Sequence, residues 1–83
     1  MKKNVLYISP MQARALALEA ANVTSARFDS QKLLESGSLY ELEFTTEEMH
    51  YTCYIDAVSG EALGLDFFPV PVEPYPSYYE ARR

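Results

Sequence analysis

The segment Tyr54–Leu63, YIDAVSGEAL, holds the residue types of a small reactive loop. Asp56 could act as a base, Ser59 as a nucleophile, and Gly60 could leave room for a ligand. The only histidine of the chain, His50, would have to complete such a site. It precedes Asp56 by six residues, which is about 20 Å along an extended strand, so these groups are not expected to converge. An enzyme that uses Asp56, Ser59 and His50 is therefore disfavoured.

The same segment also fits a turn between two strands. An alternating pattern ends at Ile55, and an apolar stretch resumes at Ala62. Asp56 is expected to accept hydrogen bonds from backbone N–H groups one to three residues later, as in an Asx turn. Gly60 is expected to take the positive φ that closes such a loop, commonly with a bulge. We therefore interpret Asp56, Ser59 and Gly60 as structural turn residues.

The other candidate reagents are the single cysteine, Cys53, and the carboxylates of Glu41 and Glu43. Cys53 and His50 lie three residues apart in an alternating pattern, so they point to opposite faces of a strand and form a poor catalytic pair. Cys53 falls on the apolar face and is expected to be a buried small hydrophobe. Glu41 and Glu43 share a face about 7 Å apart, with no partner implied, which favours a solvated sheet face over acid–base chemistry. We predict no catalytic residue, no metal ligand set and no cofactor, because the ligands of a zinc site and a glycine-rich phosphate loop are both missing.

A helix is predicted at the start of the chain, over residues 10–21. Ser9 can cap it, Pro10 suits the first helical position, and Gln12 completes a capping box. Apolar residues then repeat at helical spacing, with small alanines that would let the helix lie close to a sheet. Asn22 suits a left-handed stop at its end.

Beyond the helix the apolar period changes from 3.6 to 2, which indicates strands. Residues 39–45 and 49–56 alternate and are separated by only three residues, so they should form an antiparallel hairpin. Residues 26–34 form a weaker strand, in which Phe28 and Leu33 fall on opposite faces unless a bulge intervenes. Residues 61–68 are a last short strand. The predicted fold class is α+β, with two layers: one N-terminal helix packed on an antiparallel sheet of three to four strands.

Length and composition limit the classes of function. Eighty-three residues form one domain; we expect it to cover residues 1–66, followed by a proline- and tyrosine-rich extension over 67–83. A net charge of −5 with seven basic residues argues against nucleic-acid binding. No apolar run is long enough for an integral membrane segment, and the first residues, MKKNVLYIS, lack the apolar core of a signal peptide. Two locations therefore remain open: the cytoplasm for a complete chain, and the outside or envelope of the cell for a domain cut from an exported protein.

A single helix leaves one face of the predicted sheet uncovered, and we call this surface the open face. An uncovered face or edge is a natural docking surface for another chain. The open face is expected to show the following side chains: Leu39, Glu41, Glu43, Thr45, His50, Thr52 and Tyr54. Of these, we predict partner-binding roles for Glu41, Glu43, His50, Thr52 and Tyr54.

Three motifs in this order resemble the PepSY domain family: ISPMQARALALEAANV (8–23), LYELEF (39–44) and YTCYIDAVSGEAL (51–63). The resemblance covers about residues 8–66. It implies a helix packed on an antiparallel sheet, and a non-catalytic module without catalytic residues of its own. PepSY domains occur in propeptides of thermolysin-type metallopeptidases and in secreted or membrane-anchored bacterial proteins, where they are thought to inhibit or regulate peptidases. This chain departs from the family pattern at Asn22, where glycine is usual, and at Cys53, where an aromatic or aliphatic residue is more usual.

The function expected from these patterns is non-catalytic protein binding that inhibits or regulates a peptidase. The alternative is a self-associating structural domain, a possible homodimer, that uses the open face or the proline-rich extension. Either way the expected partner is a protein, a peptidase or a second copy.

Overall fold

The helix α1 (Pro10–Ala21) begins and ends at the capping residues. The Gln12 N–H donates a 3.0 Å hydrogen bond to the Ser9 hydroxyl, and the Ser9 N–H donates one of 2.8 Å to the Gln12 side chain. Asn22 ends the helix with φ 62° and ψ 43°, a left-handed conformation that asparagine tolerates better than most residues. Asn22 thus adopts the left-handed conformation for which glycine is the usual residue. The predicted helix over residues 10–21 is confirmed.

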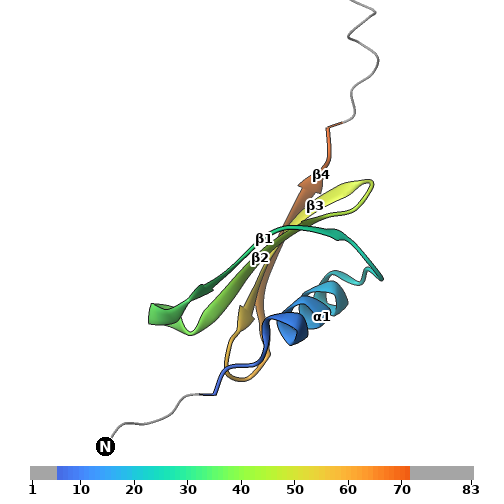
Figure 1. The fold of residues 1–83 in the computed structure, drawn as a ribbon. Coiled ribbons are helices and arrows are strands. Elements are labelled where there is room, and N and C mark those ends of the chain that lie inside the picture. The colour runs from blue at the N-terminus through green and yellow to red at the C-terminus, as the bar shows by residue number, and fades with distance from the viewer. Residues whose placement is uncertain (1–5, 72–83) are drawn as a thin grey trace, which may run out of the picture.

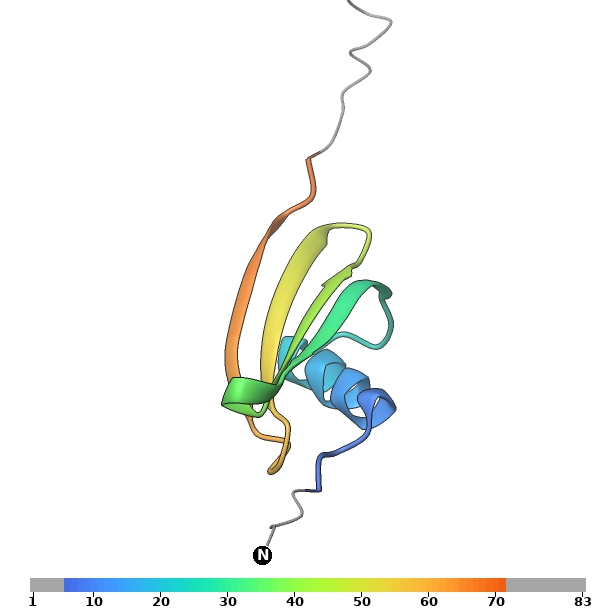
Figure 2. The ribbon, with the colours of Figure 1, turned by 60° about the vertical axis from the view of Figure 1, so that its left-hand side comes forward.

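The computed structural model describes residues 6–71, so most of the proline-rich extension, residues 72–83, lies outside the described residues. After α1 come four strands and one short 3₁₀ turn: β1 (Arg27–Leu34), η1 (Glu35–Gly37), β2 (Leu39–Thr45), β3 (Met49–Asp56) and β4 (Ala62–Pro69). The strands pair antiparallel in chain order, β1-β2-β3-β4, and α1 lies across one side of the sheet (Figures 1 and 2). The predicted α+β fold of one helix on an antiparallel sheet is confirmed, with four strands.

The predicted bulge in the first strand lies at Asp29. Phe28 pairs with Phe44 and Leu33 pairs with Tyr40, but the register shifts by one residue between Phe28 and Ser30. Phe44 and Tyr40 are both buried, so the shift brings Phe28 and Leu33 onto the same side of the sheet, where both pack against the core. Their opposite phases in the sequence are thereby reconciled.

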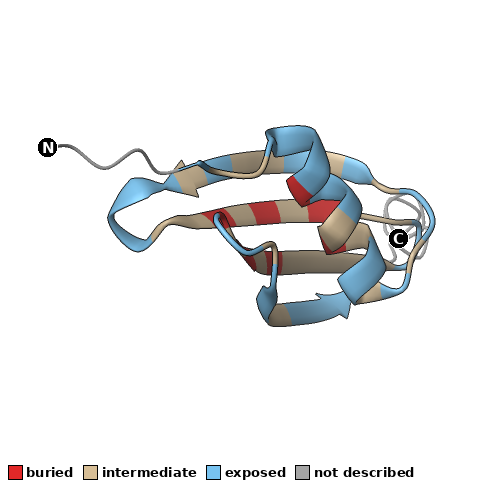
Figure 3. Cartoon of the chain, turned by 90° about the horizontal axis from the view of Figure 1, so that it is seen from below, coloured by how far each residue is buried: buried red, intermediate tan, exposed pale blue. Residues whose placement is uncertain are grey.

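The core lies between α1 and the two middle strands. Figure 3 shows the buried segments on these strands and on the side of α1 that faces them. The fully or nearly fully buried residues are Ala13, Ala17, Tyr40, Leu42, Phe44, Cys53, Ile55 and Ala57. Two alanines on the inner side of α1 allow the helix to lie close to the sheet, and the alternation in β2 and β3 puts every second side chain under it. The predicted burial of Cys53 on the apolar face is confirmed.

The residues before α1 connect the helix to β2 and to the turn that follows β3. The Ile8 N–H donates a 2.8 Å hydrogen bond to the Ala57 carbonyl, and the Tyr40 hydroxyl donates one of 2.8 Å to the Ile8 carbonyl. These two bonds satisfy both backbone groups of Ile8 at the point where the chain enters the helix.

The predicted last strand, over residues 61–68, is observed one residue further along, as β4 at Ala62–Pro69. Phe67, Phe68 and Pro69 pair with β3, and the Val70 N–H donates a 3.0 Å hydrogen bond to the Glu48 carbonyl. The proline-rich composition predicted an extension from residue 67. Proline is nevertheless compatible with β4, because β4 is an edge strand and its outward N–H groups have no partner in the sheet.

Candidate functional site

The open face carries three rows of cross-strand neighbours. The register of the sheet aligns them as Lys32–Glu41–Tyr54–Gly64, Ser30–Glu43–Thr52–Asp66 and Arg27–Thr45–His50–Phe68. All five residues predicted to bind a partner lie in these rows, between or beside the buried positions of β2 and β3, and all five are half-buried. The structure therefore brings these five side chains together on one surface.

Tyr54 lies at the centre of an acidic part of this face. Its hydroxyl is 3.4 Å from Oε2 of Glu41, and its ring lies beside Gly64, where an added Cβ would be 3.6 Å from the ring. The negative charge of Glu41, then the loss of solvent and the hydrogen bond to Glu41, raise the pKa of Tyr54, and the charges of Asp66 and Glu43 add to this shift. Tyr54 thus keeps its proton at neutral pH, as a hydrogen-bond donor surrounded by carboxylates.

A polar cluster of Asp29, Thr45 and His50 crosses the face at the other end of β2. The Thr45 hydroxyl donates a 2.6 Å hydrogen bond to Oδ2 of Asp29 and lies 2.8 Å from Nδ1 of His50. Because the single hydroxyl proton of Thr45 goes to Asp29, Nδ1 of His50 must be the donor in the second bond. The His50 ring also packs on Phe68, with ring centroids 5.0 Å apart.

Asp29 is a residue that the sequence analysis missed. The Arg27 Nε donates a 2.8 Å hydrogen bond to its Oδ1. The hydrogen bond from Thr45, and after it the one from Arg27, holds the pKa of Asp29 below its usual value. The only sequence signal was the phase conflict between Phe28 and Leu33, which marks the bulge that turns Asp29 toward Thr45.

The turn residues lie at the opposite end of β3 from His50. The Val58 and Ser59 N–H groups donate to Oδ1 of Asp56 at 2.8 and 2.9 Å, which is the geometry expected of an Asx turn. These bonds, with the one from Ser59 first, lower the pKa of Asp56. Gly60 has φ +83°, and its N–H donates to the Asp56 carbonyl. The structure does not bring Asp56 and Ser59 near His50.

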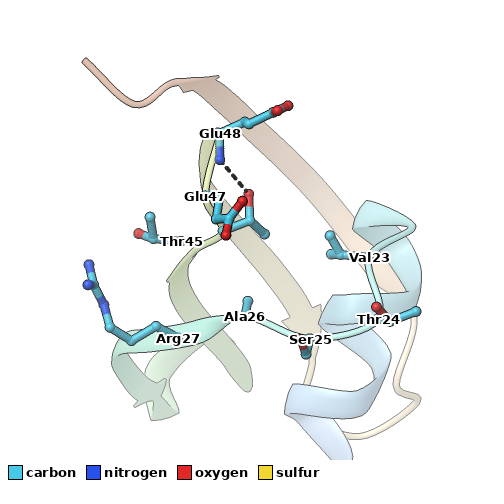
Figure 4. A pocket seen from close by; sticks show the side chains of 9 residues that line it. Val23, Thr24, Ser25, Ala26, Arg27, Thr45, Glu47 and Glu48 are labelled. Carbon is cyan, nitrogen blue, oxygen red and sulfur yellow. Dashed lines mark hydrogen bonds between the residues drawn. The ribbon is translucent and has the colours of Figure 1, made fainter. Parts of the chain in front are cut away.

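A broad hollow separates the α1–β1 connection from the β2–β3 turn (Figure 4). It has a volume of about 820 Å³ and is lined by Val23–Arg27 and Thr45–Glu48. The Glu48 N–H donates a 3.3 Å hydrogen bond to the Thr46 hydroxyl at its rim. It is a wide-open depression rather than a closed ligand cavity.

The described part of the chain offers no metal centre and no membrane span. Among residues 6–71 no three His, Cys, Asp or Glu side chains are grouped closely enough to hold a metal ion. Within the same residues, no helix combines the length and apolar character needed to cross a bilayer.

A helix on one side of an antiparallel sheet, with a polar and aromatic surface on the other side, defines a small α+β module. Comparison with protein families gives a match to PepSY, described as the peptidase propeptide and YPEB domain, over residues 7–66. The chain therefore belongs to the PepSY family, as its three motifs predicted. Searches of curated proteins and of solved structures found no match.

Proposed function

We propose that this chain is a non-catalytic protein-binding module that regulates a peptidase, with the open face as its binding surface. The observation that carries the proposal is a sheet that, within the described residues, is covered by a helix on one side only, in a chain of the PepSY family. Uncovered sheet surfaces are docking sites for other chains in many proteins.

The side chains of the open face are suited to contact rather than to chemistry. The hydrogen bond to Glu41 limits the freedom of the Tyr54 side chain, so less freedom is lost when a partner covers it. Tyrosine is enriched among the residues that dominate binding energy, because its ring packs while its hydroxyl finds a partner. Tyr54 is therefore the expected centre of the interface, with Glu41, Glu43 and Thr52 around it and His50 at one end.

The potentially reactive groups are occupied or kept apart. Asp56 and Ser59 have their hydrogen bonds within the turn, and Nδ1 of His50 is bonded to Thr45. Cys53 is buried on the other side of the sheet, and loss of solvent raises the pKa of its thiol. These placements support a binding role.

The test is to titrate the chain into assays of peptidases from the source organism, with a thermolysin-type metallopeptidase as a further probe, and to measure residual activity and complex formation. Tyr54→Ala should weaken the effect about 10-fold or more, as loss of a central interface tyrosine does. Met11→Ala is the control, because Met11 is 70% exposed on α1 and lies away from the open face. If no peptidase is bound or slowed by the unaltered chain, the proposal is wrong.

Self-association is the second candidate function, and the exposure of Phe67 and Phe68 at the edge of the sheet favours it. Light scattering on the full chain and on a chain that ends at Pro71 tests this role. The truncation has to keep Phe67–Pro69, since these residues belong to β4. Monomers in both samples would rule out self-association.

A further inference from the structure

The two edges of the sheet differ in how far they are protected from pairing with another strand. β1 carries a bulge at Asp29 and charged side chains at Arg27 and Lys32, devices that discourage edge pairing. β4 pairs in regular register from Gly64 to Pro69, and two large aromatic side chains lie on it with more than half of their surface exposed. Among the strands within residues 6–71, only β4 is therefore open along its length.

The register fixes which backbone groups of β4 face outward. The Val70 N–H donates to the Glu48 carbonyl, so Val70 and Glu48 are a hydrogen-bonded pair of the ladder. In an antiparallel ladder, hydrogen-bonded and non-hydrogen-bonded pairs alternate. Phe68, Asp66 and Gly64 thus bond to β3. The N–H groups of Leu65 and Phe67 point to the free edge.

Proline marks where this free edge ends. Pro69 is the next outward position, and it has no N–H to offer. Its placement costs the sheet no hydrogen bond, and it stops further pairing beyond Phe67. The pairing-competent edge is therefore short and centred on Leu65–Phe67.

From these observations we propose that the free edge of β4 accepts an extended, basic segment of a partner protein as a fifth strand. The inference rests on the proposed protein-binding function and adds a second surface and a partner chemistry to it. Outward N–H and C=O groups of Leu65 and Phe67 would form the ladder, as in other cases of strand addition. An apolar side chain of the incoming segment would lie beside Phe67 on the helix side of the sheet.

On the open face, charge determines which side chains of the incoming segment are favoured. Asp66 lies on the open face at the edge, and Glu43 lies two strands further in within the same row. Between residues 6 and 71 the sequence has ten acidic and three basic side chains. A Lys or Arg opposite Asp66 would make a favourable cross-strand pair, whereas an acidic residue there would be repelled.

A second copy of this chain fits the edge less well. The large apolar side chains that β4 exposes are three, Leu63, Phe67 and Phe68, which is little compared with the ~1,600 Å² of a standard protein interface. Both copies would also bring the same acidic excess to the contact. A basic strand of another protein satisfies the same backbone groups without that repulsion.

The experiment uses the full chain and a capped nine-residue peptide of alternating valine and lysine as the probe. Heteronuclear NMR follows the amide signals, and hydrogen exchange is measured at Leu65 and Phe67 with and without peptide. We expect both amides to exchange about 10-fold or more slowly in the complex. Binding should weaken with added salt and with the Asp66→Asn substitution.

Two matched controls isolate the backbone ladder. The same peptide N-methylated at alternate residues cannot pair, and it should not protect either amide. Phe67→Pro removes one outward N–H and should abolish binding, whereas Phe67→Thr keeps the N–H and should retain it. Because the methylated peptide leaves the protein unchanged, the test stands even if Phe67→Pro does not fold.

Several results would overturn the inference. One is equal binding of an alternating valine–glutamate peptide, and another is the absence of any protection at Leu65 and Phe67. Protection of these amides in the free chain at concentrations where light scattering shows a dimer would assign the edge to a second copy. Signal changes confined to Tyr54 and Glu43 would place the peptide on the open face, which rejects the edge but leaves the proposed function standing.

Discussion

The Tyr40 hydroxyl donates a 2.8 Å hydrogen bond to the carbonyl oxygen of Ile8, which connects the second strand to the residue that precedes the helix cap. Tyr40 is 5% exposed, so the Ile8 carbonyl would lose this partner without gaining much water. Tyr40→Phe should therefore lower the free energy of unfolding by about 1 kcal/mol. Urea denaturation measures this loss. Tyr51→Phe is the matched control, because the Tyr51 hydroxyl makes no hydrogen bond within residues 6–71, and an equal loss in both variants would contradict the prediction.

Gly60 combines a positive φ of +83° with a close neighbour, since a Cβ there would lie 3.2 Å from Cδ1 of Leu16. Gly60→Val should lower the free energy of unfolding by about 1 kcal/mol or more, through backbone strain and this contact. Gly37→Val serves as the control, because its nearest neighbour would be 4.0 Å away and its φ is not positive. Thermal unfolding followed by circular dichroism compares the two variants. Equal melting temperatures would show that the turn does not need glycine.

The carboxylate of Asp56 should make the turn sensitive to acid. Its pKa is lowered by the N–H groups of Ser59 and Val58, so its folded-state value lies below its unfolded value. The resulting stabilisation is fully present above the unfolded pKa, near the usual 3.8, and is lost as the pH falls through the folded pKa. Asp56→Ala should therefore melt at a lower temperature than the parent at pH 7, and the difference should shrink at pH 3. A difference that stays constant over this range would show that ionisation of Asp56 does not matter.

The cluster around Thr45 allows the causes of one pKa shift to be ranked. The hydrogen bond from Thr45 is the largest cause that lowers the pKa of Asp29, and the bond from Arg27 comes second. Thr45→Val should raise the pKa of Asp29 toward its ordinary value by more than Arg27→Lys does, because Arg27→Lys removes the guanidinium hydrogen bond and keeps the positive charge. Carboxyl titration by NMR measures both. The reverse order would mean that the guanidinium bond, rather than the hydroxyl bond, contributes most to the low pKa of Asp29.

Cys53 should react with thiol reagents only when the protein opens. It is fully buried, and loss of solvent raises its pKa, so little thiolate is available in the folded state. Labelling in native buffer should be slower than in denaturant by a factor of 100 or more, on the order of the population of open forms in a marginally stable domain. Fast labelling in native buffer would contradict the observed burial.

Local patterns in the sequence predicted the ends of the helix and the buried side of the sheet, because both depend on residues close together in the chain. Ser9, Gln12 and Asn22 marked both ends of α1 because capping involves neighbours within three or four residues. Alternation around Leu42 and Cys53 separated the buried side of the sheet from the open face, because side chains in a strand alternate strictly.

The cross-strand arrangements could not be predicted in the same way. The contact between Asp29 and Thr45 depends on a one-residue shift in register, and nothing near Asp29 in the sequence specifies its partner. The predicted last strand, over residues 61–68, agrees with β4 to within one residue, but composition could not show that Pro69 belongs to it. Composition around Pro69 is typical of an extended tail, and only the position of the strand at the sheet edge makes this proline acceptable.

The strands lie in the sheet in the same order as in the sequence, and this order affects how the protein folds. Each strand pairs with its neighbour in the sequence, so hairpins can close early over short loops. The helix is the exception: a 12-residue helix is marginal by itself, and its attachment through Ile8 reaches Ala57, far along the chain. During synthesis on the ribosome, α1 emerges first but has to wait for β3 and the turn after it before it can dock.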